Sequence, residues 1–419
     1  MESRVPSSWK GAERMKNNIS LEEAQDLLLK NCLIKDKENV DLPCALGRVL
    51  ADNIKAQENI PPFVRSPYDG YALKAEDTTG VTKEAPAQLE VIGEVPAGYF
   101  PKEKIEKGKA IKILTGAPVP EGADAVVPYE KTNLEGNRLQ VFSPLLPGEN
   151  VVPEGEDVRE GELLAEAGAL ITPPLTGLLA SLGIGKVTVY KRPKIAIVSI
   201  GDELLDVSEP LIPGKIHNSN AYTLASYCRE LGADPVIIGT ASDKVEEAAS
   251  LIEMGLSRAD MVITSGGASV GDYDVTGRSF AAIKTEMLYW KIAIKPGSPT
   301  LAGTKDGKVI LGLSGNPAAV MVTFQLTATA FIKKMSGRNN YLPHKVDAIL
   351  KKDFNKASPT RRFLRGKLLF EAGMLFVDAS DRQGNGVLRS AVGCNVLAEI
   401  PKGSGAIKAG QKLTAYLLD

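Results

Sequence analysis

The chain has 419 residues, which is enough for two to four domains with sizeable hydrophobic cores. Hydrophobic residues make up 43% and charged residues 24% of the chain, which is typical of a folded globular protein and excludes a disordered, collagen-like or coiled-coil chain. The formal net charge is -1, from 50 Lys and Arg against 51 Asp and Glu, so the basic excess of a nucleic-acid-binding protein is missing.

Histidine and cysteine are scarce, which limits the chemistry available to the protein. The two histidines, His217 and His344, are far apart, and no two of the four cysteines form a C-x-x-C pair. A zinc or redox motif is therefore not indicated, and scattered cysteines favour a reducing compartment. The N-terminal sequence lacks the apolar stretch of a signal peptide, and no apolar run is long enough for a membrane span. We expect a cytoplasmic protein without membrane contact.

The pattern of apolar residues indicates different secondary structure in different parts of the chain. A short N-terminal helix is expected over 21–31, because Ser20 and Glu23 form a capping box before apolar residues at helical spacing. From about residue 61 to residue 167, short apolar runs are separated by Gly and Pro, which indicates a β-rich module. The same pattern, which indicates β-structure, returns after about residue 340.

Between residues 193 and 337, apolar strands alternate with helices. We expect the strands at 194–200, 236–239, 261–264 and 309–313, and the helices at 218–231, 244–256 and 317–335. In the last helix, Asn316 is the expected cap and Pro317 the first residue. This alternation predicts a parallel sheet with helices on both faces, and such sheets bind ligands beyond the carboxyl ends of their strands.

Each of these strands is followed by polar or Gly-rich residues: GDELL, TASD, SGGASVGDYD and SGNP. The SGGASVG segment contains Ser265, Gly266, Gly267 and Ser269. Its glycines would let backbone amides wrap an anion, although a tight strand-to-helix turn needs the same residues. The segment is neither a phosphate-binding Walker loop nor a dinucleotide fingerprint.

Carboxylates stand at three of the strand ends, at Glu203, Asp243 and Asp274. Converging carboxylates beside an anion-binding loop would suit Mg²⁺ that is held partly by substrate phosphates. For Asp243 a structural role stays open as well, because Asp243 and Glu246 form a capping box for the next helix.

Other candidate residues are cationic or lie in turns. Lys291 and Lys295 would share one face of a strand, where they could bind an oxyanion or remain solvated. The segments SPYDGYA and GEDVREGE are compatible with plain exposed turns. Residues 333–419 carry sixteen Lys and Arg against seven Asp and Glu, which gives either a solvated basic face or a basic wall beside an anionic ligand.

As a set, several segments resemble one family. They occur in this order: SPYDGYA, ILTGAPVPEGADAVV, GEDV, SIGDEL, GKIHNSNAYTL, TSGGASVGDYD, WKIAIKPGSP, GLSGNP and FLRG. Together they resemble the molybdopterin molybdenumtransferases, which are of the MoeA type and are related to the gephyrin E domain. The resemblance extends from about residue 61 to the C-terminus.

The resemblance implies an α/β plus β architecture. Its parts are a central, doubly wound molybdopterin-binding α/β domain, an inserted β-rich lobe and a C-terminal β-barrel. The expected division is an N-terminal helix and linking segment at 17–58, the lobe at 59–157, a linking segment at 158–192, the α/β domain at 193–338 and the barrel at 339–419.

The resemblance also implies an activity and partners. Members of the family are homodimers that share an active cleft between subunits. They take adenylylated molybdopterin, release AMP in a Mg²⁺-dependent step and insert molybdate. A molybdopterin adenylyltransferase and molybdoenzyme maturation factors are possible partners, whereas nucleic acid and membranes are not expected.

Carried over motif by motif, the family's site residues fall on the β-rich lobe, the α/β domain and the barrel. The catalytic positions would be Asp69, Asp157, Glu203, Asp243 and Asp274, with Asp243 and Asp274 binding Mg²⁺. The substrate-binding positions would be Thr115, Ser265, Gly266, Gly267, Ser269, Lys291, Lys295, Asn316, Pro317 and Arg365.

Three departures from the family pattern concern the molybdate site. Ser298 replaces the second lysine of K-P-G-K-P, Ser314 replaces the first proline of P-G-N-P, and Ala319 stands where a serine often follows. Pterin binding is thus better supported by the sequence than molybdate binding. The alternatives are a non-catalytic scaffold that binds molybdopterin or a partner, and a variant that inserts tungstate. The sequence does not identify the apoenzymes that receive the cofactor.

Overall fold

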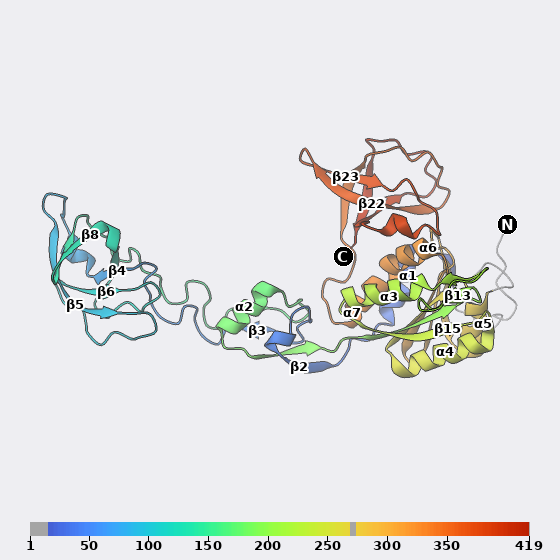
Figure 1. The fold of residues 1–419 in the computed structure, drawn as a ribbon, viewed down its shortest axis with the longest axis horizontal. Helices are drawn as coiled ribbons and strands as arrows, with labels where there is room; N and C mark the ends of the chain where they lie inside the picture. The colour runs from blue at the N-terminus through green and yellow to red at the C-terminus, as the bar shows by residue number, and fades with distance from the viewer. Residues whose placement is uncertain (1–15, 269–273, 419) are drawn as a thin grey trace. The chain divides into compact units, whose positions relative to one another are not determined.

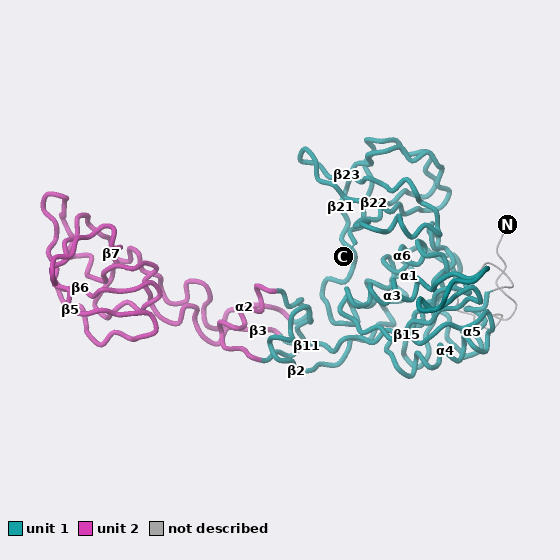
Figure 2. The backbone as a smooth tube through the Cα atoms, viewed as in Figure 1, with its two compact units in different colours: residues 1–52, 167–172, 186–419 teal, residues 53–166, 173–185 magenta. Residues whose placement is uncertain are grey.

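The computed structural model of the chain describes residues 16–268 and 274–418. Contacts divide the chain into two compact units, drawn in two colours in Figure 2. The first unit comprises residues 1–52, 167–172 and 186–419, and the second comprises residues 53–166 and 173–185.

The first unit contains the expected α/β domain, built on a seven-stranded sheet (Figure 1). In sheet order its strands are β1 (Lys16–Ile19), β17 (Glu286–Ile292), β19 (Leu301–Lys305), β20 (Lys308–Leu313), β16 (Met261–Gly266), β12 (Lys194–Ile200) and β15 (Asp234–Ala241). Only β19 pairs antiparallel with its neighbours, and the other pairings are parallel. The four strands predicted from the sequence are therefore confirmed as a parallel set.

Helices cover both faces of this sheet, as the doubly wound architecture requires. They are α1 (Leu21–Lys30), α3 (Ser219–Glu230), α4 (Val245–Arg258), α5 (Val275–Ala282), α6 (Pro317–Thr323) and α7 (Thr329–Met335). Along β12, Ile195 and Ile197 pack in one core cluster with α1, α3, α6 and α7, whereas Ala196 and Val198 pack in the other with α4 and α5. Both faces of the strand are buried, which explains its continuous apolar sequence.

The helix boundaries follow the capping residues in most places. At α1 the backbone N–H of Glu23 donates to Ser20 Oγ at 3.1 Å, as predicted. The single helix expected over 317–335 is interrupted by a π-helical segment, Phe324–Ala328. Asn316 stands at the N-cap of α6 and Pro317 at its first turn, but the Asn316 side chain makes no capping hydrogen bond.

The C-terminal part of the first unit is a closed five-stranded β-barrel. Its strands are β21 (Lys345–Leu350), β22 (Arg361–Glu371), β23 (Met374–Ala379), β24 (Val396–Ile400) and β25 (Lys412–Leu417). The pairing of β22 with β24 closes the barrel, and β18 (Ile294–Lys295) from the α/β domain adds to β22 in parallel. A short helix, η6 (Leu388–Ala391), follows β23.

The second unit is the expected β-rich module. Its six-stranded sheet runs β7 (Ala125–Pro128), β4 (Gly70–Leu73), β6 (Lys109–Ile113), β5 (Ala87–Val95), β9 (Arg138–Val141) and β8 (Thr132–Glu135). The same unit holds α2 (Pro173–Ser181), the β3 (Ile54–Lys55) and β10 (Leu163–Ala165) pair, η3 (Ala75–Thr78) and η4 (Tyr129–Lys131).

Small elements complete the first unit. They are the antiparallel pair β2 (Lys37–Asp41) and β11 (Lys186–Tyr190), the parallel pair β13 (Leu204–Leu205) and β14 (Ile216–His217), and η2 (Leu42–Cys44). Within the described residues, no helix is both long and apolar enough to cross a membrane.

Candidate functional site

The carboxyl ends of β20, β16, β12 and β15 lie next to one another, because these strands are sheet neighbours in that order and run parallel. The polar segments that follow the four strands therefore gather at one edge of the sheet, as the sequence predicts. This edge carries Glu203, Asp243 and Asp274 and the Gly-rich turn after β16.

Asp202 and Asp243 form a reciprocal pair at this edge. The backbone N–H of Asp202 donates to Asp243 Oδ2 at 3.3 Å, and the N–H of Asp243 donates to Asp202 Oδ1 at 3.1 Å. Both side chains are exposed, as is that of Glu203. Asp202 was missed in the sequence, although its place in the segment after β12 could have indicated it.

The expected capping box at Asp243 is wrong. Helix α4 begins later, with Lys244 at its N-cap and no side-chain capping bond. Glu247 instead reaches back and accepts hydrogen bonds from the N–H and the hydroxyl of Ser242. The carboxylate of Asp243 is therefore not used to start the helix and remains at the edge of the sheet.

The turn after β16 needs glycine for steric reasons. Gly266 has φ of +92°, and a Cβ at this position would collide with the carbonyl oxygen of Ile200 on β12. Thr276 Oγ1 donates to the Gly266 carbonyl at 2.8 Å and ties the turn to α5. Ser265 is buried, and its hydroxyl has no hydrogen-bond partner among the described residues, whereas Ser269 lies outside them. Anion binding by this loop stays a prediction.

Asp274 is the buried carboxylate of the site. It is 2% exposed and caps α5, since Oδ1 accepts the Gly277 N–H at 2.9 Å. Its second oxygen, Oδ2, is buried without a hydrogen-bond partner in the described part of the chain. Burial raises the pKa of Asp274 to about 6, although the Gly277 N–H, the charge of Lys291 and the Trp290 side chain act in the opposite direction.

The two lysines of WKIAIKPGSP do not share a face, contrary to the sequence prediction. Lys291 has φ of +70°, which breaks the strand alternation, and the strand ends at Ile292. The Lys291 side chain is buried, with its Nζ 3.9 Å from the centroid of the Trp290 ring. Burial lowers the pKa of Lys291. Lys295 belongs to β18 instead and is exposed.

The segment after β20 contacts the barrel. The N–H of Ala318, in the first turn of α6, donates to the carbonyl of Asn385 at 3.0 Å. Ser314 is buried, and its hydroxyl accepts the Asn316 N–H at 3.4 Å. This contact brings the loop after β23 to the start of α6.

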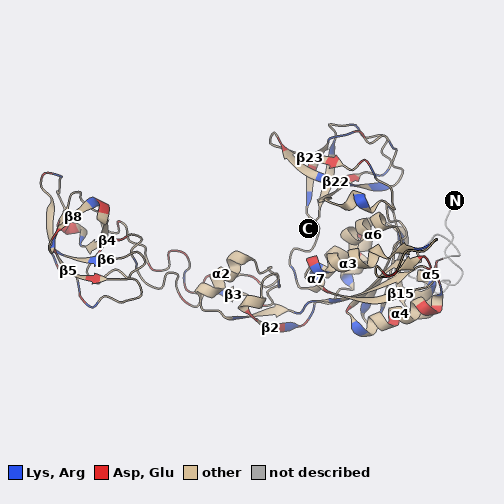
Figure 3. Ribbon diagram, viewed as in Figure 1, with Lys and Arg blue, Asp and Glu red and all other residues tan. Residues whose placement is uncertain are grey.

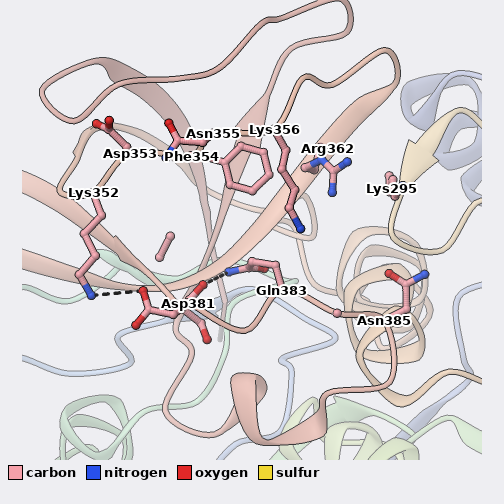
Figure 4. Close-up of a pocket in the computed structure, with 13 residues that line it drawn as sticks. Lys295, Lys352, Asp353, Phe354, Asn355, Lys356, Arg362, Asp381, Gln383 and Asn385 are labelled. Carbon is pink, nitrogen blue, oxygen red and sulfur yellow. Dashed lines mark hydrogen bonds and ion pairs between the residues drawn. The ribbon is translucent and has the colours of Figure 1, made fainter.

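Beside that contact lies a pocket of about 480 Å³ (Figure 4). It is lined by Lys295, Lys352, Asp353, Phe354, Asn355, Lys356, Arg362, Ala379, Ser380, Asp381, Gln383, Gly384 and Asn385. Four of these residues are basic and two are acidic. All except Lys295 come from the barrel, where Figure 3 colours Lys and Arg blue. Its strand β22 begins with Arg361 and Arg362.

Arg365 does not line this pocket, although the resemblance implies a substrate-binding role for it. Its side chain is fully buried and donates to Ser390 Oγ at 2.8 Å and to the carbonyls of Arg382 and Gly384 at 3.3 and 3.1 Å. Gln383 adds two bonds to the Arg365 backbone. Arg365 thus holds the loop that forms one wall of the pocket.

In the second unit, Asp69 and Thr115 come together. Asp69 Oδ1 accepts the N–H of Thr115 at 2.7 Å and its hydroxyl at 2.9 Å, and these bonds lower the pKa of the exposed Asp69 carboxyl. Asp157 is also exposed, and its N–H donates to the Ile60 carbonyl at 2.9 Å.

The carboxylates at the sheet edge fit a metal ion that takes only some of its ligands from the protein. No group of three His, Cys, Asp or Glu that could hold a metal occurs within the described residues. Mg²⁺ often keeps only one or two carboxylates and takes its other oxygens from water and substrate phosphates. The unpartnered Oδ2 of Asp274 and the exposed Asp243 are compatible with such a site.

Three sequence profiles of known families match consecutive parts of the chain. The MoeA N-terminal region (domain I and II) matches residues 19–183, the "Probable molybdopterin binding domain" matches residues 196–334, and the MoeA C-terminal region (domain IV) matches residues 347–418. The order of the matches agrees with the order of the structural parts.

Relatives match over nearly the whole length. The molybdopterin molybdenumtransferase of Staphylococcus epidermidis is 35% identical over 402 residues, and that of Staphylococcus aureus is 33% identical over 404 residues, with 96% of each chain covered. A solved molybdopterin biosynthesis MoeA protein of Pyrococcus horikoshii is 34% identical, with a TM-score of 0.81 over 95% of this chain and 99% of that one. The chain therefore belongs to the molybdopterin molybdenumtransferase family.

Proposed function

We propose that this protein completes the molybdenum cofactor: it takes adenylylated molybdopterin, releases AMP and inserts molybdate into the pterin. Membership of a transferase family that acts in molybdenum cofactor biosynthesis is the starting point. The observation that carries the proposal is the basic pocket between β18 and the barrel, because both molybdate and the substrate phosphates are anions.

The charges of this pocket favour an anionic ligand. Its two carboxylates are already paired, Asp353 with Lys408 at 2.8 Å and Asp381 with Lys352 at 3.6 Å. Among the described residues, Lys295, Lys356 and Arg362 have no such carboxylate partner. Three cations therefore remain to neutralise a ligand, and hydrogen bonds between charged groups are stronger than neutral ones.

For AMP release we propose Mg²⁺ bound by Asp243 and Asp274, with Glu203 beside them. The metal would supply charge neutralisation at the phosphates that separate in this step. The remaining substrate-binding residues inferred from the family, including those of the Gly-rich turn and Arg365, keep their proposed roles. Arg365 also holds the loop that forms one wall of the pocket, and its Nη1 is buried without a hydrogen-bond partner among the described residues.

We also propose a cytoplasmic homodimer, with Asp69, Thr115 and Asp157 completing the site. These three residues lie in a compact unit separate from the other site residues, and a dimer can bring one subunit's residues to the other's cleft. The proposed division of the chain stays at 17–58, 59–157, 158–192, 193–338 and 339–419. A molybdopterin adenylyltransferase and molybdoenzyme maturation factors are the proposed partners.

The test is to mix the purified protein with adenylylated molybdopterin, Mg²⁺ and molybdate, and to follow both AMP and finished cofactor. The proposal expects both products, and expects AMP release to stop when EDTA removes the metal. Tight pterin binding without AMP release would identify a non-catalytic scaffold instead. A parallel reaction with tungstate in place of molybdate tells which oxyanion the protein prefers.

A further inference from the structure

Two cations lie side by side where the α/β domain joins the barrel. Strand β18 pairs in parallel with β22, and the register places Lys295 opposite Arg362. Side chains at paired positions of neighbouring strands point to the same face, and both residues line the basic pocket. Like charges opposite one another are destabilising, and a bound anion would relieve the repulsion between them.

The neighbouring residue, Arg361, is an example of a cation with a structural role in this chain. Arg361 forms ion pairs with Glu22 at 2.6 Å and with Glu399 at 2.7 Å. Arg362 has no carboxylate partner in the described part of the chain, and burial lowers its pKa. The difference between adjacent residues of β22 argues that Arg362 is not a stabilising ion-pair partner.

The Arg362 side chain is nevertheless held in place. Its Nε donates to Ser358 Oγ at 3.1 Å, and its guanidinium lies 5.4 Å from the centroid of the Phe354 ring. Ser358 is itself fully buried. Because Nε is already hydrogen-bonded, the two terminal nitrogens remain, and they can donate in parallel to two oxygens of one tetrahedral oxyanion. Figure 4 shows Arg362 and Lys356 reaching toward the pocket from the barrel.

We propose that Arg362, together with Lys295, binds a tetrahedral oxyanion in this pocket and supplies the cation that Ser298 does not. This inference rests on the proposed function and names the residue of the site that sets its affinity for the oxyanion. The oxyanion can be free molybdate or a phosphate of the pterin substrate. The two share their chemistry, and the experiment separates them.

The experiment compares wild type with Arg362→Gln, Arg362→Lys and the double variant Arg362→Gln/Ser298→Lys. One arm titrates molybdate and measures half-maximal cofactor formation, and the other measures binding of adenylylated molybdopterin by calorimetry. The matched control is Lys412→Gln, which removes an exposed barrel cation paired with Asp347 outside the pocket. Salt and Mg²⁺ are kept constant, because screening alters charge effects.

Arg362→Gln should raise the molybdate concentration for half-maximal insertion about tenfold or more, and Arg362→Lys should raise it less, since lysine keeps the charge but loses the fork. Adding Ser298→Lys should restore part of the loss, and Lys412→Gln should match wild type. If Arg362→Gln weakens only the binding of adenylylated molybdopterin, the oxyanion at Arg362 is the substrate phosphate.

If Arg362→Gln and Arg362→Lys both give the same curves as the wild type in both arms, the inference is overturned and the proposed function is unaffected. Absence of AMP and cofactor from the wild-type protein would instead refute the proposed function. If Arg362→Gln fails to fold, Arg362→Lys carries the test in both arms, because it retains a charge at position 362 and removes the fork. Unchanged curves in both arms would again overturn the inference.

Discussion

At the scale of single residues, Asp274 combines a structural role with a proposed catalytic one. Its Oδ1 caps α5, and its Oδ2 lies buried with no hydrogen-bond partner among the described residues. A carboxylate in this environment destabilises the fold when it is ionised, because burial disfavours the charged form. Such a cost is typical of residues that are selected for function rather than stability.

Asp274→Asn should therefore stabilise the metal-free protein at high pH. Burial raises the pKa of the folded-state carboxyl to about 6, so its contribution to stability is full below about pH 4 and is lost as the pH rises through 6. Asparagine has no such titration and can still cap α5. Urea unfolding at pH 8 should show a gain on the order of 2 kcal/mol, and the gain should shrink toward zero near pH 4.

The same Asp274→Asn protein should have lost Mg²⁺-dependent AMP release, since a neutral amide is a poor ligand for the metal. Wild-type turnover by this variant would show that Asp274 does not bind the metal. Equal stability of the two proteins at pH 8 would show that the carboxyl is less desolvated than its burial indicates.

Asp243→Ala should cost little stability, because Asp243 does not cap α4. The substitution removes one acceptor for the Asp202 N–H at an exposed site, which is worth about 0.5–1 kcal/mol or less. Asp243→Asn keeps an acceptor and should cost less still, while both variants should lose AMP release. Thermal unfolding of the two variants checks the first point, and a loss above 2 kcal/mol in Asp243→Ala would contradict it.

At the scale of elements, β22 links the barrel to α1. Arg361, at its first position, donates to Glu22 on α1 and to Glu399 on β24, and it also contacts the Tyr416 hydroxyl at 2.7 Å. The side chains of Arg361 and Glu399 are 17% and 18% exposed, so this pair is largely shielded from water, whereas Glu22 is 55% exposed.

Arg361→Ala should destabilise the protein by about 2–3 kcal/mol, because it leaves the half-buried Glu399 without its cation. Glu22→Gln is the matched control and should cost less than about 1 kcal/mol, since an exposed ion pair contributes little. Urea unfolding followed by fluorescence and circular dichroism measures both. Equal losses for the two variants would mean that the α1 contact, and not Glu399, determines the effect.

The sequence predicts most of the elements but not the break in the last long helix. Strands of the α/β domain were predictable because their continuous apolar runs are bounded by polar ends. The π-helical segment was not, because all its residues are buried and no polar stripe records the change in helical register. Thr323 and Thr327 donate back to the carbonyls of Ala319 and Thr323, a contact that bends helices and is not visible in apolar spacing.

At the scale of the whole molecule, complementation can test the proposed homodimer. Asp69→Asn and Asp274→Asn should each be inactive alone. If one subunit's Asp69 completes the other's cleft, mixed dimers contain one site with both residues intact, and random mixing should restore about a quarter of wild-type AMP release.

Sedimentation velocity at micromolar concentration provides the companion measurement for this prediction. A single monomer species would refute the dimer. A dimer whose mixed variants stay inactive would mean that each subunit completes its own site.

The basic pocket is the part of the site that sequence analysis described least. The motifs identified Lys295 and the excess of cations after residue 333, and Arg362 was visible as a basic residue of that segment. Nothing in the sequence shows that β18 leaves the central sheet and pairs with β22, because a two-residue strand has no periodic pattern. Gln383 was missed for a similar reason, since its role depends on backbone atoms of Arg365.

The pairing of β18 with β22 has a consequence for exchange measurements. The barrel is closed through β22 and β24, so its own ladder can stay intact while β18 separates from it. Backbone amides in the short β18–β22 ladder should then exchange with deuterium through a local opening, faster than amides in the middle of β22. A bound oxyanion that bridges Lys295 and Arg362 would slow this exchange, so isotope uptake at two strand positions would report pocket occupancy without any assay of turnover.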